Sequence, residues 1–163
     1  MVDELASQVA HKLQQVNRRI VLAESCTSGL IAARLGGIPG ISQHLCGSFV
    51  VYRERSKVGW LGVDADLLAS HTTESLHASS AIAAGALRNT EEADISLGIT
   101  GHLGPDAPPE KDGLVFIIIW NRSNQTQPIR SVEKRLAAHN RVDRQEEAAS
   151  EALRELLYCL GDL

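Results

Sequence analysis

The sequence predicts a three-layer α/β/α sandwich, with helices on both faces of a mixed, mostly parallel central sheet of about five strands. Short apolar runs alternate with helical patterns along most of the chain, which is typical of the α/β class. The run "LVFIIIW" at 114–120 is apolar on both faces, as a central strand should be. Because 163 residues without a repeat or linker suit one domain, we expect residues 1–163 to form a single domain.

The first predicted elements are a helix, a strand and a second helix. Residues 3–16 carry apolar side chains at helical spacing and predict an amphipathic helix. "RIVLAE" at 19–24 predicts a short buried strand. "CTSGLIAARLGG" at 26–37 predicts a helix that begins among hydroxyl-bearing residues and ends at Gly36 and Gly37.

The middle of the chain predicts one strand and two helices. "HLCGSFVVY" at 44–52 predicts a strand that contains a glycine, and 53–63 predicts a polar turn with a short apolar patch. Residues 64–71 predict one or two helical turns. Residues 72–90 predict a full helix, with an apolar face that includes Leu76, Ile82 and Leu87.

The last third of the chain predicts three strands and a long helix. "ADISLGITG" at 93–101 predicts a strand, and the Gly, Pro and Asp residues of 102–113 predict a loop. The runs at 114–120 and 129–137 follow each other closely, so we expect them to form an antiparallel hairpin. Residues 140–160 predict the terminal helix.

Composition and charge exclude several classes of function. The formal net charge is −4 and aromatic residues make up 4%, so there is no basic surface and few stacking rings for a nucleic acid. No apolar run approaches the roughly 20 residues of a membrane helix, and the charged N-terminal segment does not resemble a signal peptide. Three widely spaced cysteines indicate reduced thiols. We therefore expect a cytoplasmic protein that binds neither nucleic acid nor membrane.

The segment "AESCTSG" at 23–29 is the strongest candidate site. It lies where a predicted strand passes into a helix, and open α/β sheets bind ligands at the carboxyl ends of strands. Backbone N–H groups at a helix start can hold an anion or a developing oxyanion, and hydroxyl groups add donors. The alternative is that one of Ser25, Thr27 or Ser28 only caps the helix.

Two further segments place candidate groups at strand ends. Tyr52 and Lys57 follow the second strand, and a lysine whose pKa is lowered by burial can act as the base of a nearby serine. The alternative is a solvated surface lysine. Thr100, Gly101 and Gly104 follow the third strand, in a segment long enough to favour a functional loop over a plain connection.

Two other titratable groups need explanation. His102 lies in the third candidate segment, where it can act in acid–base chemistry if it faces a pocket; the alternative is that it faces water. Glu24 ends a buried strand and therefore needs a partner. We expect a structural hydrogen bond to a neighbouring loop, with ordering of a ligand or of Lys57 as the alternative.

The six histidines lack metal-ligand spacing, so we expect no metal site.

The candidate segments, in this order, resemble the C-terminal domain family of CinA, the nicotinamide-mononucleotide amidases. The family pattern is approximately "AESCTGG", "GG-V-Y-N--K-LGV" and "TG-AGP". The matching segments are "AESCTSG" (23–29), "CGSFVVYRERSKVGWLGV" (46–63), "GALR" (85–88), "TGHLGP" (100–105) and "NRVDRQ" (140–145). The resemblance implies hydrolysis of the carboxamide of this nucleotide to nicotinate mononucleotide and ammonia. It also implies the three-layer fold, the stand-alone form of the domain, a homo-oligomer (a dimer or larger), and no cofactor.

Amide hydrolysis needs a nucleophile, a base and an oxyanion site. We expect Ser25 to be the nucleophile, Lys57 its base, and Tyr52 a relay or donor of a proton. The oxyanion would be held by backbone N–H groups between Cys26 and Gly29, or by that of Gly101. The thiol of Cys26 is the alternative nucleophile, because a helix start lowers a thiol pKa.

The remaining site residues are expected to bind the substrate. Arg141, Thr27 and Thr100 are candidates for the phosphate, since a planar guanidinium can donate to two of its oxygens. It is left open whether the helix start binds the phosphate or the oxyanion. The expected substrate-binding set is Thr27, Ser28, Gly29, Thr100, Gly101 and Arg141.

The sequence departs from the family pattern at several positions. The family segment "GAVSE" is "TTESL" at 72–76, and "TGIAGP" is "TGHLGP" at 100–105. The departing residues include Ser28, Ser48, Leu76, His102, Leu103 and Gln145. Side chains added where backbone must approach a ligand narrow a pocket. Two alternatives therefore stay open: a binding module without turnover, its pocket blocked by Ser28, His102 or Leu103, and an amidase for a different amide.

Overall fold

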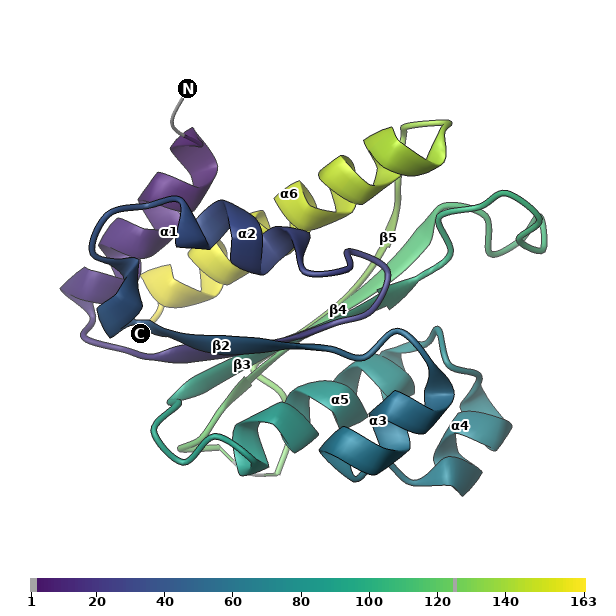
Figure 1. Cartoon of the computed structure of the whole chain (residues 1–163), viewed down its shortest axis with the longest axis horizontal. Helices are drawn as coiled ribbons and strands as arrows, with labels where there is room; N and C mark the ends of the chain where they lie inside the picture. Colours follow the sequence, from purple (N-terminus) through teal and green to yellow (C-terminus); the bar gives the residue numbers. More distant parts are fainter. Residues whose placement is uncertain (1–2, 125) are drawn as a thin grey trace.

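The computed structural model describes residues 3–124 and 126–163, and a five-stranded sheet forms its middle layer (Figure 1). In chain order the strands are β1 (Ile20–Glu24), β2 (Leu45–Val50), β3 (Ile95–Gly101), β4 (Leu114–Asn121) and β5 (Arg130–Arg135). Their order across the sheet is β2-β1-β3-β4-β5. The mixed α/β sheet of five strands is therefore confirmed.

The expected majority of parallel pairs is wrong. β1 pairs in parallel with β2 and β3, whereas β4 is antiparallel to β3 and to β5, as the hairpin prediction required. A parallel return needs a crossover of a dozen or more residues, usually a helix. The segment 102–113 between β3 and β4 contains no helix, so the chain reverses there.

Helices cover both faces of the sheet (Figure 1). On one face lie α1 (Glu4–Gln15), α2 (Leu30–Gly36) and α6 (Arg141–Gly161), and on the other α3 (Glu54–Leu61), α4 (Ala65–His71) and α5 (Leu76–Arg88). Successive residues of a strand face opposite layers. Leu22 of β1 therefore packs in the core beneath α1 and α6, whereas Val21 packs in the core beneath α5.

The long helices begin at side-chain caps. Asp3 accepts a hydrogen bond from the backbone N–H of Ala6 at 3.0 Å, and Asn140 accepts one from that of Asp143 at 3.0 Å. Each cap satisfies an N–H group that has no partner inside the helix. The predicted helices at 3–16 and 140–160 are therefore confirmed, and each observed end lies within one residue of the predicted one.

Two predicted segments differ from the structure near the candidate site. The expected turn at 53–63 is wrong, because 54–61 form α3. Its pattern was hard to recognise since it buries Lys57 where an amphipathic helix usually buries an apolar residue. The helix expected from residue 26 begins only at Leu30; Cys26–Gly29 form a turn, and Gly29 has a φ of 92°.

Glycines allow close packing of α5 on its neighbours. A Cβ on Gly98 of β3 would collide with the carbonyl oxygen of Ser79 and lie 2.8 Å from the Cβ of Ala83. A Cβ on Gly85 would collide with the carbonyl oxygen of Leu61 in α3. Real Cβ atoms do not approach so closely, so glycine at these two positions sets the distance of α5 from β3 and α3.

The ends of several strands meet at one edge of the sheet. β1, β2 and β3 run in parallel and end at Glu24, Val50 and Gly101. β4 runs back, so β5 ends at this edge too, and α6 begins there at Arg141. Loops that are far apart in the sequence are thereby brought together, as expected for a ligand site of an α/β fold.

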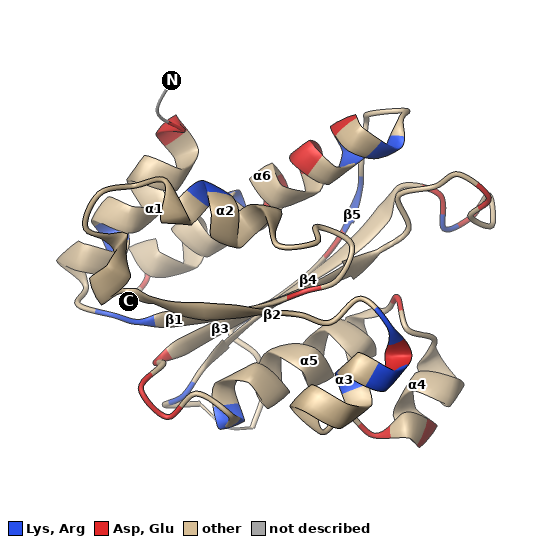
Figure 2. Cartoon of the chain, in the orientation of Figure 1, with Lys and Arg blue, Asp and Glu red and all other residues tan. Residues whose placement is uncertain are grey.

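Charged residues lie on helices and strands as well as in loops, and β5 is rich in them (Figure 2). Lys and Arg alternate with Asp and Glu along α6 and at the start of α3 (Figure 2). Among the described residues, no helix is long and apolar enough to cross a membrane.

Candidate active site

The turn after β1 is organised by the buried carboxylate of Glu24. Its oxygens accept five hydrogen bonds of 2.8 to 3.1 Å, from the hydroxyls of Thr27 and Ser48 and the backbone N–H groups of Gly29, Ile31 and Ala32. The N–H groups at the start of α2 are therefore already occupied by a protein carboxylate. They are therefore not free to hold a phosphate or an oxyanion in this conformation. Glu24 makes structural hydrogen bonds, as expected.

Ser25 and Lys57 form a buried pair at the end of β1. The Nζ of Lys57 lies 3.2 Å from the Oγ of Ser25 and donates at 3.3 Å to the backbone carbonyl of Tyr52. Lys57 is 1% exposed and Ser25 is 7% exposed. The expected geometry of nucleophile and base is present, and the alternative of a solvated lysine is wrong.

Burial lowers the pKa of Lys57, although the negative charge of Glu74 opposes this change. A buried ammonium loses its hydration and favours the neutral amine. A neutral amine within hydrogen-bond distance of a serine hydroxyl can accept its proton. The electrostatics therefore suit a Ser–Lys catalytic pair.

The neighbouring thiol is not activated. Burial raises the pKa of Cys26 to about 12, so the thiol stays protonated near neutral pH. Only a thiolate is an effective nucleophile, and the alternative of a cysteine nucleophile is therefore not favoured. The backbone N–H groups of Cys26 and Thr27, however, have no acceptor on another residue in the described ranges.

A pocket of about 270 Å³ opens above this pair. It is lined by Ser25 and Cys26 after β1, Tyr52 after β2, Glu74 before α5, the segment Gly101–Pro108 after β3, and Arg141 of α6. The pocket thus forms where the strand ends meet, and its lining combines Ser25 with one arginine and two carboxylates, Glu74 and Asp106.

Arg141 closes one wall of the pocket. Its guanidinium donates to the carbonyl oxygen of Gly104 and to the hydroxyl of Tyr52, both at 2.5 Å. The hydroxyl of Tyr52 therefore contacts Arg141, whereas its backbone carbonyl contacts Lys57. Tyr52 thus connects Lys57 to Arg141, but among the described residues no hydrogen bond joins its hydroxyl to Ser25.

Several predicted binding residues lie elsewhere. Thr27 donates to Glu24 and is buried. Ser28 is exposed, with a φ of 53°, and does not line the pocket. The hydroxyl of Thr100 lies 2.8 Å from that of Ser79 and is directed to α5. Of the predicted set, Gly101 and Arg141 line the pocket.

The loop after β3 is held by an arginine that sequence reasoning passed over. Arg144 is 8% exposed and makes a two-fold ion pair with Asp112, at 2.6 and 2.7 Å, and donates to the carbonyl of Ala138 at 2.8 Å. The next residue, Gln145, donates to the carbonyl of Cys26 at 3.2 Å. The sequence did contain a signal for both residues, because they belong to the "NRVDRQ" segment that resembles the family pattern.

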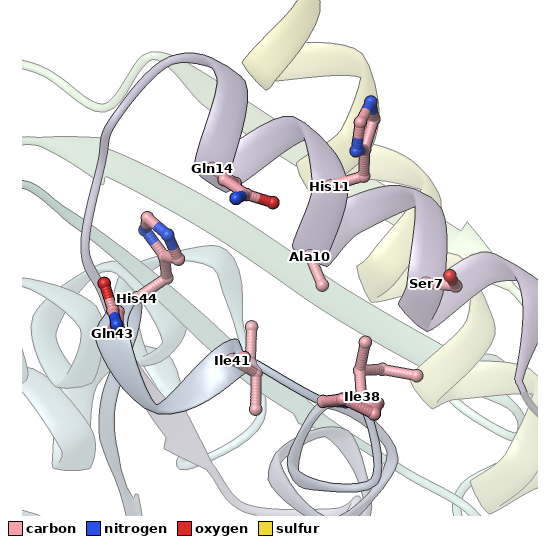
Figure 3. A pocket seen from close by; sticks show the side chains of 10 residues that line it. Ser7, Ala10, His11, Gln14, Ile38, Ile41, Gln43 and His44 are labelled. Carbon is pink, nitrogen blue, oxygen red and sulfur yellow. The ribbon is translucent and has the colours of Figure 1, made fainter.

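A second hollow lies near the opposite ends of the strands. It has a volume of about 340 Å³ and is lined by His11 and Gln14 of α1 on one side and by Ile38, Ile41, Gln43 and His44 on the other (Figure 3). No carboxylate, lysine or arginine is among the described residues that line it. Nor do three or more His, Cys, Asp or Glu residues form a metal-binding group in the described ranges. The pocket at Ser25 is therefore the candidate active site.

Comparison with known proteins identifies relatives over almost the whole chain. The family model "CinA C-terminal domain" matches residues 2–160. A CinA-like protein of Mycobacterium leprae is 36% identical over 99% of this chain and 36% of its own length. One of Mycobacterium tuberculosis is 43% identical over 68% of this chain and 24% of its own length. The chain thus spans about a quarter to a third of the length of these relatives.

Solved structures share the same fold. A CinA superfamily protein from Klebsiella pneumoniae has a TM-score of 0.90 and 26% identity, over 98% of both chains. A competence or damage-inducible protein from Enterobacter asburiae has a TM-score of 0.87 and 28% identity, also over 98% of both chains.

Proposed function

This chain belongs to the CinA C-terminal domain family, and on that basis we propose that it is a serine amidase that hydrolyses the carboxamide of nicotinamide mononucleotide. The products are nicotinate mononucleotide and ammonia. The observation that carries the proposal is the buried contact of 3.2 Å between the Nζ of Lys57 and the Oγ of Ser25. A lysine that has only a structural role is rarely buried against a serine hydroxyl without a carboxylate partner.

In the first half of the reaction, the neutral amine of Lys57 accepts the proton of Ser25. The Oγ attacks the amide carbon, and the oxyanion that forms accepts hydrogen bonds from the backbone N–H groups of Cys26 and Thr27. The carbon–nitrogen bond then breaks, the Lys57 ammonium gives its proton to the departing nitrogen, and ammonia leaves. Ser25 is left as an ester of the nicotinate group.

In the second half, Lys57 accepts a proton from water, and the hydroxide attacks the ester carbonyl. The tetrahedral intermediate collapses, the bond to the Oγ breaks, and Lys57 returns a proton to Ser25. The product leaves as a carboxylate and a proton is released. Tyr52 holds Lys57 through its backbone carbonyl, at 3.3 Å, in both halves.

Arg141 is the phosphate-binding residue of this proposal. It lines the same pocket as Ser25 and is exposed enough to meet a charged ligand. The guanidinium is held by Gly104 and Tyr52, so it is oriented before the substrate arrives and loses little entropy on binding.

Ammonia release from nicotinamide mononucleotide tests the proposal directly. We expect release by the wild type and loss of at least about a thousandfold in Ser25→Ala. Ser28→Ala is the matched control, because Ser28 is an exposed serine of the same turn, and it should keep full activity. Binding of the nucleotide without release would instead identify a binding module, and release from other amides only would identify a different substrate.

A further inference from the structure

Two residues of the pocket have charges or polar atoms that the proposed mechanism does not use. The Nε2 of His102 lies 3.6 Å from the Oε2 of Glu74, and both residues line the pocket with Ser25. This separation is beyond hydrogen-bond length. The Nε2 is buried without a partner among the described residues, and no described side chain or backbone group donates to the Glu74 carboxylate within hydrogen-bond distance.

Both residues lie where this sequence departs from the family pattern. Glu74 is the third residue of "TTESL", and His102 is the third of "TGHLGP". The structure brings these two departures together across the pocket, from the connection between α4 and α5 and from the end of β3. The pocket therefore contains this pair in addition to the contact between Ser25 and Lys57.

The loop that carries His102 is rigidly held. The backbone N–H of His102 donates to the carbonyl of Leu114 at 2.8 Å, and the carbonyl of His102 accepts from the N–H of Gly113 at 2.9 Å.

The side chains of Glu74 and His102 are 29% and 21% exposed. Glu74 is thus a largely covered carboxylate whose oxygens remain available to a ligand, and its charge is weakly screened.

The lining of the pocket contains charges of both signs. Two carboxylates line the pocket, and that of Glu74 is the more covered because Asp106 is exposed to solvent. Arg141, with its contacts to Gly104 and Tyr52, forms a positive wall of the same pocket. The charge of Glu74 acts on Lys57, which contacts Ser25, whereas Arg141 contacts Gly104 and Tyr52. A ligand with a positive charge near its amide and a negative charge further away is complementary to these contacts.

We propose that Glu74, positioned beside His102, is a specificity-determining residue that selects a substrate with a cationic ring next to the scissile carboxamide. This inference rests on the proposed function, since nicotinamide mononucleotide has a pyridinium ring bonded directly to the carboxamide carbon. The 1,4-dihydro form of the nucleotide has the same carboxamide, ribose and phosphate, but its ring is neutral. The carboxylate of Glu74 attracts the first ring electrostatically and not the second.

Binding of the two forms separates this inference from catalysis. In a Ser25→Ala background, which prevents turnover, calorimetry should give at least about tenfold tighter binding of the cationic form than of the dihydro form. Adding Glu74→Gln should abolish most of that preference by weakening binding of the cationic form alone. Glu74→Asp, which keeps the charge, should retain part of it.

Glu54→Gln is the matched control. Glu54 is an exposed carboxylate at the start of α3 whose charge also acts on Lys57, but it is not among the described residues that line the pocket. Its replacement should leave the preference unchanged. Equal binding of the two forms, or a preference that survives Glu74→Gln, would overturn the inference even if the wild type releases ammonia. Failure of both forms to bind would overturn the inference and the proposed function together.

Discussion

The Nζ of Lys57 lies 3.2 Å from the Oγ of Ser25, although 32 positions separate the two residues in the chain. Ser25 is in the turn after β1, and Lys57 is in α3, which follows the neighbouring parallel strand β2. The parallel pairing of β1 and β2 ends both strands at the same edge, and α3 then covers that edge with its buried lysine.

The first prediction concerns Lys57 as a base. Lys57→Met should reduce amidase activity by about 10²–10⁴-fold, since it removes the group that accepts the serine proton but keeps a side chain of similar length. Initial rates of ammonia release measure the effect. Thermal unfolding is the control, because loss of a buried amine should leave the melting temperature unchanged or higher. A variant with full activity would exclude Lys57 as the base.

The second prediction concerns pH. Because burial lowers the pKa of Lys57 in the folded protein, the unfolded chain binds more protons between that lowered value and about 10.4. The free energy of unfolding should therefore rise with pH across this window. Below the window Lys57 is charged in the folded protein, and the full cost of burying that charge lowers the stability. Activity should rise across the same lowered pKa, since the neutral amine is the base.

Urea unfolding of the wild type and of Lys57→Met, measured in steps of pH, checks the sign. The difference in unfolding free energy between them should change in favour of the wild type as pH rises. A difference that is constant with pH would show that Lys57 has the same pKa in both states.

The third prediction concerns the turn after β1. Glu24→Gln should lower the free energy of unfolding by about 2–4 kcal/mol, because an amide nitrogen would replace one acceptor oxygen and leave buried N–H groups unpaired. The same variant should lose activity, since the turn positions Ser25. Chemical denaturation measures the loss, and Glu91→Gln at an exposed site should change stability little. Equal stability of the two variants would contradict this role.

The fourth prediction concerns Ser28. Its φ of 53° lies in the left-handed region, which costs a residue with a Cβ roughly 1–2 kcal/mol relative to glycine. Ser28→Gly should therefore raise the unfolding free energy by about 1 kcal/mol and keep activity, because Ser28 is exposed and does not line the pocket. Ser28→Ala should give no such gain, and a stabilisation of equal size in both variants would exclude backbone strain as the cause.

The sequence by itself determined the elements whose patterns are long and regular. Helices α1 and α6 follow from apolar spacing, and β4 from an unbroken apolar run. It also made Ser25, Lys57 and Arg141 candidates, because the segments that contain them resemble the family pattern. These features depend on local periodicity and on chemistry carried by single residues.

Only the tertiary structure decided which candidates meet. Thr27 and Thr100 bear the same hydroxyl chemistry as Ser25, yet one donates to Glu24 and the other contacts Ser79. Helix α3 depends on a lysine whose burial no local pattern predicts, and Glu74 meets His102 only because separate loops end at one edge of the sheet. Burial, side-chain direction and strand pairing depend on contacts between residues distant in the chain, and local sequence does not specify those contacts.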